Sequence, residues 1–410
     1  MIGSARSSVR RGAAAGTALQ QQQRRWRFSG PVSRAQLGKK KRNTGEQTAS
    51  IQTSSTDQAA GAADSNAENV FTYDAPGLGA AVIHSHYDRL GHFVQVPDFL
   101  NEPKTCAIIG APMSWGQPRA GTDQGSIILR NCGLEGTLLG LEWRVDDMGD
   151  LEFDPPSRTD KKLKDGPIKG KAKNSFCVGQ GLKKIHDEVY KATKKGEFPL
   201  ILGGDHSISA GTVSAILRAR PDTGIIWVDA HGDLNTPESS PSGNMHGMPL
   251  GLLMGLVDPT KIPGWEWFAD VPKLKPEQLV FVGLRDLDSM ERDVIIEKNI
   301  KAFTMFDVDR FGIGKVMDMA TEHLKGRPLH LSYDIDAVDP ELAPATGTVV
   351  RGGFNFREAH YISEAVACTG RLGSMDLVEV NPKLTEGPES EATAQLGMAL
   401  IASAMGSRIL

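Results

Sequence analysis

Residues 224–233 read Gly224-Ile225-Ile226-Trp227-Val228-Asp229-Ala230-His231-Gly232-Asp233, and the expected architecture can be built outward from them. Four large apolar residues run straight into three side chains of the kind that bind metal ions. A short, nearly continuous apolar run is typical of a strand buried on both faces of a parallel sheet. Such sheets place their sites at the carboxyl ends of the strands. The segment therefore predicts a central strand that delivers Asp229, His231 and Asp233 to a functional site.

Five further apolar runs accompany this one. From Thr105 onward the pattern repeats as an apolar run, a turn with Gly or Asp, and a stretch with the spacing of an amphipathic helix. Strands that alternate with helices form a sheet covered on both faces. We therefore expect an α/β protein with three layers, α/β/α, and a mostly parallel, doubly wound sheet. The five other predicted strands are Cys106–Ile109, Leu200–Leu202, Leu279–Val282, Leu329–Leu331 and Leu377–Val380.

Two of the other predicted strands also end in metal-binding residue types. In extended backbone, side chains at positions i, i+2 and i+4 share one face. Asp229, His231 and Asp233 are therefore expected to converge on one side of their segment, and Asp334 and Asp336 on one side of theirs. The two additional segments are Gly203-Gly204-Asp205-His206-Ser207 and Ser332-Tyr333-Asp334-Ile335-Asp336-Ala337-Val338-Asp339-Pro340.

The combined set favours a centre with two metal ions. Four carboxylates held so close together would repel one another and raise one another's pKa values. Divalent cations remove that repulsion, and carboxylate and imidazole ligands without thiolate suit ions such as Mn²⁺. Six ligands are too many for one ion with an open position, but they suit two ions with bridging carboxylates. A single Asp of this kind would be a helix cap or turn residue. The six candidate ligands are His206, Asp229, His231, Asp233, Asp334 and Asp336.

The three segments resemble the signatures of the ureohydrolase family, whose members are dimanganese enzymes that hydrolyse guanidino compounds to urea. The resemblance covers nearly all of residues 104–406, and it is to arginase rather than agmatinase in the segments between the signatures. These segments are Ile109-Gly110-Ala111-Pro112, Gly116-Gln117-Pro118-Arg119, Asn235-Thr236-Pro237, Ser242-Gly243-Asn244-Met245-His246-Gly247, Gly283-Leu284-Arg285-Asp286-Leu287-Asp288 and Glu379-Val380-Asn381-Pro382.

The resemblance implies two Mn²⁺ ions per subunit and a hydroxide between them that attacks the guanidinium carbon. Asp229 and Asp334 would bridge the ions, and Asp233 would also take part in catalysis. By the same resemblance, one ion would be held by His206, Asp229, Asp233 and Asp334, and the other by Asp229, His231, Asp334 and Asp336.

Further roles follow from the resemblance and fit the chemistry of the substrate. A guanidinium stays charged at neutral pH and is met by a carboxylate with bidentate hydrogen bonds, which is the role implied for Glu379. The leaving amine needs a proton, and His246 matches the proton-shuttle histidine. The implied substrate contacts are Asn235, Ser242 and Asn244 for the α-carboxylate, Asp288 and Glu291 for the α-amino group, and Thr348 with Glu379 for the guanidinium.

The expected activity is hydrolysis of L-arginine to L-ornithine and urea. Two alternatives stay open: a ureohydrolase acting on agmatine or a guanidino acid, and a catalytically silent regulatory paralogue. A silent paralogue should have lost a ligand, and all six positions keep Asp or His. The resemblance also implies a homo-oligomer, a trimer or a hexamer.

The charge of the 410-residue chain is unevenly distributed. Its net charge of -4 argues against nucleic acid as a partner, and no stretch is apolar enough to predict a membrane span. Residues 1–45 hold eleven Arg and Lys and no acid, which leaves about -15 on the other 365 residues. Such a leader is typical of a transit peptide and predicts a mitochondrial location; an uncleaved basic tail and a cytoplasmic location are the alternative. Residues 46–69 are expected to be a linker, and residues 70–410 a single catalytic domain.

Several other features are interpreted as structural. Arg158–Lys173 carries seven basic residues and is expected to be an exposed charged loop, with docking of an acidic partner as the alternative. The cysteines form no C-x-x-C pair and are expected to be buried packing residues. These are Cys106, Cys132, Cys177 and Cys368. The histidines expected to be solvated or packed are His84, His86, His92, His186, His323, His330 and His360.

Overall fold

The computed structural model describes residues 70–73, 81–84, 97–157, 172–385 and 387–408. The predicted leader, the predicted linker and most of the predicted basic loop lie outside these ranges, as do the side chains of His84, His86 and His92. In the first described segments, β1 (Val70–Tyr73) pairs antiparallel with β2 (Ala81–His84).

The main sheet has eight strands among the described residues, and every neighbouring pair in it is parallel. Their spatial order is β4-β3-β5-β10-β9-β6-β7-β8. This confirms the predicted parallel α/β sheet. The strands are β3 (Thr105–Ala111), β4 (Arg144–Asp150), β5 (Phe198–Gly203), β6 (Gly224–Val228), β7 (Leu279–Leu284), β8 (Lys301–Thr304), β9 (Leu329–Asp334) and β10 (Leu372–Val378).

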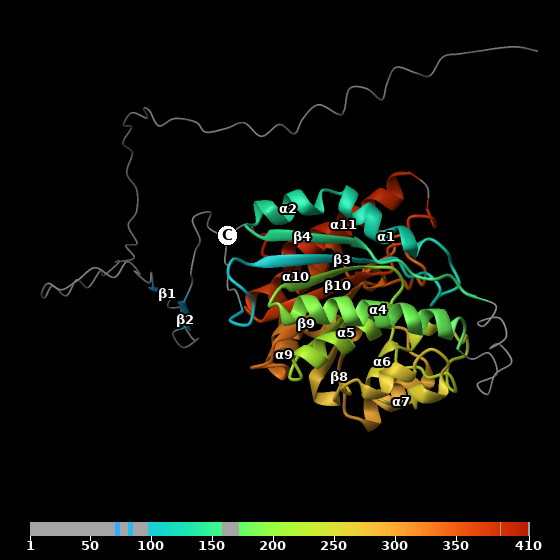
Figure 1. Cartoon of the computed structure of the whole chain (residues 1–410). Helices are drawn as coiled ribbons and strands as arrows, with labels where there is room; N and C mark the ends of the chain where they lie inside the picture. The colour runs from blue at the N-terminus through green and yellow to red at the C-terminus, as the bar shows by residue number, and fades with distance from the viewer. Residues whose placement is uncertain (1–69, 74–80, 85–96, 158–171, 386, 409–410) are drawn as a thin grey trace, which may run out of the picture. The chain divides into compact units, whose positions relative to one another are not determined.

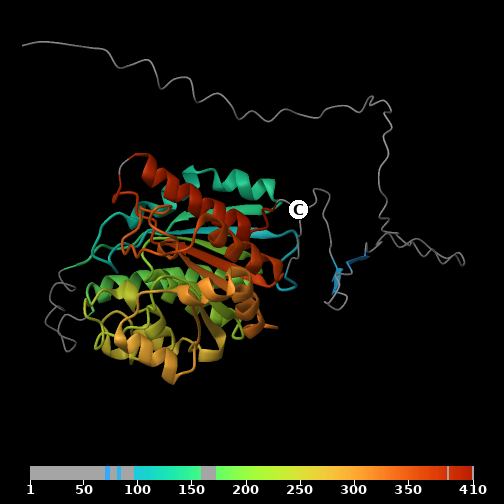
Figure 2. The ribbon, with the colours of Figure 1, turned by 180° about the vertical axis from the view of Figure 1, so that it is seen from behind.

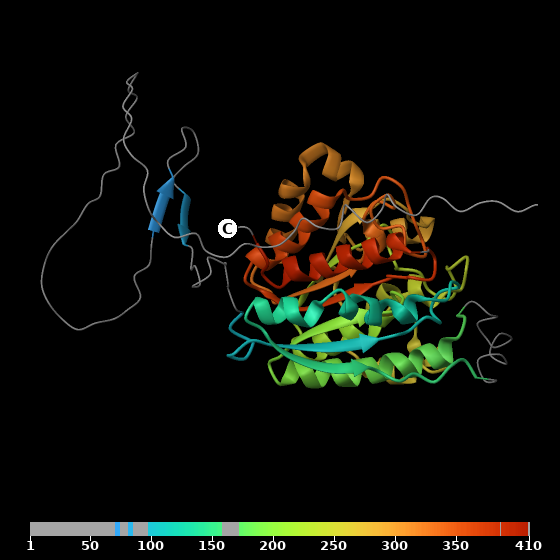
Figure 3. The same ribbon diagram turned by 90° about the horizontal axis from the view of Figure 1, so that it is seen from above.

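Helices cover both faces of this sheet, which confirms the three layers (Figures 1, 2 and 3). Each face has its own hydrophobic cluster, because successive strand residues point to opposite sides: Ile108 belongs to one cluster and Ile109 to the other. The first cluster is covered by α1 (Gly125–Asn131), α2 (Leu134–Gly140), α8 (Met305–Phe311), α9 (Ile313–His323), α10 (Phe356–Cys368) and α11 (Pro388–Ala404). The second is covered by α4 (Ser175–Lys194), α5 (Ile208–Ala219), α6 (Pro249–Leu253) and α7 (Ser289–Glu297).

The six predicted strands are the six inner strands of the sheet, whereas the two edge strands were not predicted. Only one flank of an edge strand is paired, so its residues need not be apolar. β4 exposes Asp146 and Asp147, and β8 is only four residues long. The prediction for the last strand was wrong in its bounds, because β10 begins at Leu372 and ends at Val378. Glu379 ends the strand with a left-handed φ of 65°.

The described histidines with a predicted packed or solvated role fit that prediction, whereas the cysteines fit theirs only in part. His186, His330 and His360 hydrogen-bond to serine hydroxyls at 2.8–3.0 Å, while His323 is exposed. Cys106 and Cys177 are buried, but Cys132 is half-buried and Cys368 is exposed, so the expectation was wrong for these two. Cys368 is the last residue of α10, where the helix leaves the core. Among the described residues, no helix is long and apolar enough to cross a membrane.

His186 should make the stability of the fold depend on pH. Its Nδ1 lies 2.8 Å from Ser214 Oγ; burial lowers its pKa to about 4, helped by Arg218 and Lys183 and opposed by Asp187. The unfolded chain, with a pKa near 6.5, then binds the proton more readily, so stability falls as the pH drops through this window. Between pH 7 and pH 5 the wild type should lose about 2 kcal/mol more than a His186→Asn variant, which keeps a donor but does not titrate.

Urea denaturation of both proteins at the two pH values measures this difference. The asparagine leaves space beside Trp267, so the variant should be less stable at pH 7. The relevant quantity is therefore the change with pH for each protein. Equal losses for both would contradict the assignment of a proton-free His186 in the folded state.

Candidate metal centre and active site

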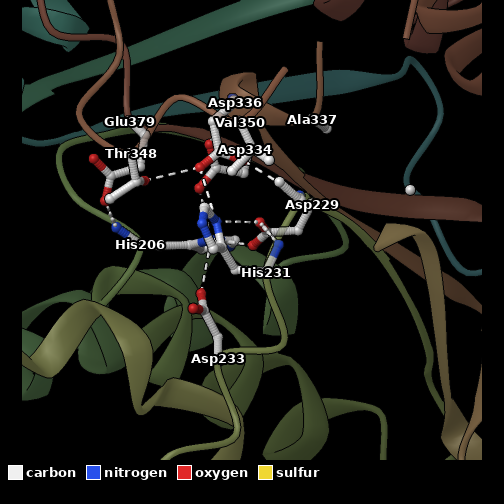
Figure 4. Close-up of polar contacts among 12 residues, drawn as sticks. His206, Asp229, His231, Asp233, Asp334, Asp336, Ala337, Thr348, Val350 and Glu379 are labelled. Atoms are coloured by element: carbon white, nitrogen blue, oxygen red, sulfur yellow. Dashed lines mark hydrogen bonds and ion pairs between the residues drawn. The ribbon is translucent and has the colours of Figure 1, made fainter. Parts of the chain in front are cut away.

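The candidate ligands gather at one edge of the sheet, beyond the carboxyl ends of its central strands. β5, β10, β9 and β6 are consecutive neighbours, and each is followed by at least one residue of the predicted site. His206 follows β5 and Glu379 follows β10. Figure 4 shows the imidazoles of His206 and His231 among the four aspartates. All six candidate ligands are thus brought together, as the sequence predicted.

The first group of ligands surrounds His206. The Nδ1 atom of this buried imidazole lies 3.0 Å from Asp229 Oδ2, 3.1 Å from Asp233 Oδ2 and 3.0 Å from Asp334 Oδ2. The ring stacks on Trp227 with 4.2 Å between the centroids. His206, Asp229 and Asp233 form a group that could hold a metal ion.

The second group surrounds His231 and shares Asp229 with the first. His231 Nδ1 lies 3.4 Å from Asp229 Oδ1 and 3.1 Å from Asp336 Oδ2. Asp229 thus presents one oxygen to each imidazole, as a bridging carboxylate must. These three residues form the second group that could hold an ion. Asp334 contacts His206 through Oδ2, while its Oδ1 accepts a hydrogen bond from the Asp336 amide at 2.8 Å.

The ligands converge through turns, so the expectation of extended backbone was wrong. β6 ends at Val228, and the Asp229 carboxylate accepts a hydrogen bond from the His231 amide at 2.7 Å. Asp334 likewise folds the chain into the short 3₁₀ helix Ile335–Ala337. Aspartate side chains commonly bond the backbone two residues on and so compete with strand structure. Asp233 has a φ of 50°, a strained conformation of the kind found at functional sites.

The electrostatics of the cluster call for added positive charge. The three nearby carboxylates raise the pKa of His206 well above its ordinary value, although burial opposes them. Burial and then Asp229 raise the pKa of Asp233 to about 6; burial and then Asp336 raise the pKa of Asp334 well above normal. Divalent cations would meet the same demand without protons, and the donors are the oxygen and nitrogen types that such ions prefer. The residues therefore fit a metal centre.

Glu379 and His246 lie together beside the cluster. Oε1 of Glu379 accepts a hydrogen bond from the His206 amide at 2.9 Å and lies 3.3 Å from His246 Nδ1. The carboxylate raises the pKa of His246 although burial opposes it. Within the described part of the chain, the buried Oε2 atom of Glu379 has no hydrogen-bond partner. A buried carboxylate oxygen without a partner is costly unless a ligand donates to it.

A cavity of about 140 Å³ opens onto the metal ligands. Of the predicted substrate contacts, Asn235, Ser242, Asp288, Glu291 and Thr348 line it, whereas Asn244 and Glu379 do not. The complete lining is His206, His231, Asp233, Asn235, Ser240, Pro241, Ser242, His246, Gly247, Asp288, Glu291, Asp334 and Thr348.

Ser240 lines the cavity but was missed by the sequence reasoning. Its hydroxyl accepts a hydrogen bond from the Gly243 amide at 2.9 Å and lies 3.4 Å from Ser242 Oγ. The spacing Ser240-Pro241-Ser242 was the available signal, because alternate residues in a short loop can face the same side. Asn244 instead accepts a hydrogen bond from Lys173, the last residue of the predicted basic loop, at 3.2 Å.

The acidic wall of the cavity is held by its own hydrogen bonds. Asp288 Oδ2 accepts a hydrogen bond from Asn235 Nδ2 at 2.8 Å. Glu291 accepts from the amides of Asp288 and Leu234 at 2.9 and 3.0 Å, and burial raises its pKa to about 7. Thr348 donates to Asp336 Oδ2 at 2.9 Å. These contacts present polar atoms to the cavity in a fixed arrangement.

Two further carboxylates of the signature segments, those of Asp205 and Asp339, lie outside the ligand set. Asp205 accepts from the Gly116 amide at 2.8 Å and from the Ser207 hydroxyl at 2.5 Å. Asp339 accepts from the amides of residues 341, 352 and 353. Their carboxylates are thus occupied by backbone and hydroxyl donors rather than aimed at the two imidazoles.

Comparisons with known proteins agree with this geometry. Residues 104–406 match the arginase family. An arginase of Glaciozyma antarctica (strain PI12) is 43% identical over 76% of this chain and 90% of its own length, and Arginase-1 of Homo sapiens is 43% identical over 70% and 88%. The arginase structure from Bacillus caldovelox has a TM-score of 0.69 at 39% identity and covers 75% of this chain and 100% of its own.

Fold, site and relatives together define a hydrolase with a metal-binding centre of aspartate and histidine. The chain belongs to the arginase family.

Proposed function

We propose that this protein hydrolyses L-arginine to L-ornithine and urea with two Mn²⁺ ions per subunit. The observation that carries the proposal is the paired ligand set, in which Asp229 lies between His206 and His231 at the edge of a cavity. Its relatives are named arginases, and the related structure from Entamoeba histolytica is described as a complex with L-ornithine.

The residues divide the chemistry among them. Two ions held by the six ligands would supply a nucleophilic hydroxide near neutral pH. Glu379 binds the guanidinium through its free Oε2 atom and so fixes the carbon opposite the ligands. His246, whose raised pKa keeps it protonated longer, gives a proton to the leaving amine. Asp233 would accept a proton from the attacking hydroxide.

The far end of the cavity selects an α-amino acid. Asp288 supplies negative charge for the α-ammonium group, and Glu291, which accepts from the Asp288 amide, lies behind it. Asn235, Ser242 and the unpredicted Ser240 supply polar contacts for the α-carboxylate, with Asn244 close to them in the same loop. Thr348 lies against Asp336 on the guanidinium side. Agmatine has no carboxylate, so it would make none of these contacts, and each hydrogen bond to a charged group that is lost costs about 1.5–3 kcal/mol.

Urea release from arginine, agmatine and guanidinobutyrate after Mn²⁺ loading tests the proposal. We expect turnover of arginine to exceed that of agmatine by roughly 100-fold or more, because several polar groups lose their partners together. Equal or better turnover of agmatine would overturn the arginine assignment. No urea from any substrate, despite bound Mn²⁺, would favour the silent paralogue.

We also propose that the protein forms a homo-oligomer, a trimer or hexamer. Large apolar side chains are exposed on α8 and α10, two helices that both pack against α9. They are Phe306, Phe311, Phe356 and Tyr361. Exposed apolar clusters of this kind mark contact surfaces. Sedimentation velocity at micromolar concentration tests the proposal, and a monomer would contradict it.

The basic composition of residues 1–45 supports the further proposal of a mitochondrial location, with the cytoplasm as the alternative. A fluorescent fusion of these residues, compared with the same fusion carrying neutral residues at the eleven basic positions, tests import. Identical cytoplasmic fluorescence for both would contradict it.

A further inference from the structure

A buried polar ladder runs through the sheet directly behind the metal centre. On β9, His330, Ser332 and Asp334 occupy alternate positions and so share one face, and the last of them is a candidate metal ligand. On the neighbouring strand β10, Ser374 is in register with His330, and Asp376 is in register with Ser332. His330, Ser332, Ser374 and Asp376 are fully buried. Burying polar side chains in the core of a sheet costs free energy unless they are hydrogen-bonded. A buried polar group of this size therefore indicates a specific role.

The ladder connects Asp376 to His206 through one hydroxyl. Ser332 Oγ lies 2.6 Å from Asp376 Oδ1 and 3.0 Å from His206 Nε2. The other oxygen of Asp376 accepts a hydrogen bond from Ser209 at 3.0 Å and lies 3.4 Å from His330 Nε2. Burial alone would raise the pKa of Asp376, but His330, His206 and the Ser332 hydrogen bond outweigh it and hold the pKa below its ordinary value.

Counting protons along this path fixes the tautomer of His206. An ionised Asp376 can only accept, so the single Ser332 proton is donated to it. The Ser332 oxygen is then left as an acceptor, and His206 Nε2 must carry the proton between them. With Nε2 protonated, Nδ1 is the nitrogen that remains to bind a cation, and it faces three carboxylate oxygens at 3.0–3.1 Å.

The three carboxylates favour a cation at Nδ1. Nδ1 of His206 has no hydrogen-bond partner within the part of the chain that the structure describes, although it is buried. The three carboxylates attract a proton or a divalent cation placed on Nδ1, and the proton must leave when the metal ion binds. If Ser332 donated to His206 instead, the neutral imidazole would keep its single proton on Nδ1, in the place of the ion.

We propose that Ser332 and Asp376 are positioning residues that hold His206 in the Nε2-protonated form and so prepare Nδ1 to bind a metal ion. The inference rests on the proposed metal-dependent function. Ser332 and Asp376 are not among the residues proposed to bind substrate or metal. Their hydrogen bonds reach the His206 group of ligands and not the His231 group.

The test is Mn²⁺ binding to the metal-stripped full chain, measured by equilibrium dialysis and calorimetry for the wild type, Ser332→Ala and Asp376→Asn. Loss of a partner that orients a metal-binding histidine typically weakens metal affinity by about 10- to 100-fold. We expect that loss for one ion in both variants, with the other ion nearly unaffected. Ser363→Ala is the matched control, because this buried serine on α10 lies outside the ladder. It should bind both ions as the wild type does.

A second measurement separates positioning from general loosening of the core. If Ser332 acts on the metal, the rise in Tm that Mn²⁺ produces should shrink in Ser332→Ala and stay intact in Ser363→Ala. A lower Tm of Ser332→Ala with unchanged Mn²⁺ affinity would overturn the proposal, and so would an equal weakening of both ions. If Asp376→Asn does not fold, the Ser332→Ala variant, which removes a single oxygen, still tests the proposal. A wild type that binds no Mn²⁺ would instead refute the proposed function itself.

Discussion

Replacing Asp229 with asparagine is expected to lower urea production from arginine by roughly 1,000-fold or more, about 4 kcal/mol in activation free energy. The reason lies in its position, since its two oxygens lie 3.0 Å from the imidazole of His206 and 3.4 Å from that of His231. Asparagine keeps the shape but removes the charge and one acceptor. Both groups of ligands lose a member at once, so Mn²⁺ content should fall together with activity.

Three measurements on the Asp229→Asn variant check this prediction: urea release, bound manganese per subunit, and the rise in Tm on adding Mn²⁺. Asp339→Asn is the matched control. Its carboxylate also follows β9, but it accepts from the backbone of residues 341, 352 and 353 and lies away from the cavity. The control should keep activity and Mn²⁺ binding. An Asp229→Asn variant with full manganese and full activity would refute the shared-ligand assignment.

The inner part of the fold could be predicted because burial constrains its sequence. A strand such as β5 is buried at every position, and that demand leaves a run of apolar residues that is easy to recognise. An edge strand such as β4 pairs on one flank only. Its exposed Asp146 and Asp147 resemble loop residues, so its place beside β3 could not be predicted from local pattern alone.

The composition of the site could be predicted more reliably than its geometry. Aspartate and histidine at three strand ends were enough to indicate that His206 and Asp334 meet, because parallel strands bring their carboxyl ends to one edge. The path of the chain after Val228 was not predictable in the same way. There the His231 amide donates a hydrogen bond to Asp229, and the chain turns instead of continuing as a strand. Whether it turns or stays extended depends on neighbouring strands that are far away in the sequence.

The polar ladder could not be predicted from the pattern of apolar residues. Leu329–Leu331 was recognised as a strand in spite of His330, which was treated as an isolated packing residue. His330 does pack, with its Nδ1 atom 2.9 Å from Ser374 Oγ. Its regular spacing with Ser332 and Asp334 becomes meaningful only when β10 is placed alongside, because Asp376 comes from a segment more than forty residues later.

Replacing Glu379 with glutamine is expected to lower kcat/KM for arginine by roughly 100- to 1,000-fold, or about 3–4 kcal/mol, while bound Mn²⁺ stays unchanged. Glu379 is buried, and its Oε2 atom has no partner among the described residues. A guanidinium that donates to it forms a charge-assisted bond that glutamine cannot replace. The glutamine amide group would instead direct a donor at a cation, so binding in both the ground state and the transition state should weaken.

Steady-state kinetics with arginine and metal analysis of the same preparation measure the two sides of this prediction. Glu358→Gln, which removes a carboxylate at the start of α10, is the control and should behave as the wild type. The positive φ of Glu379 is retained in glutamine, so a folding defect of the backbone is not the expected cause of any loss. Loss of Mn²⁺ in Glu379→Gln would assign this residue to the metal centre, whereas normal kcat/KM would remove it from the guanidinium site. The predicted result is that Glu379→Gln retains the metal but binds the cationic substrate poorly. The reason is that Oε1 contacts the His206 amide, whereas Oε2 is free for the substrate.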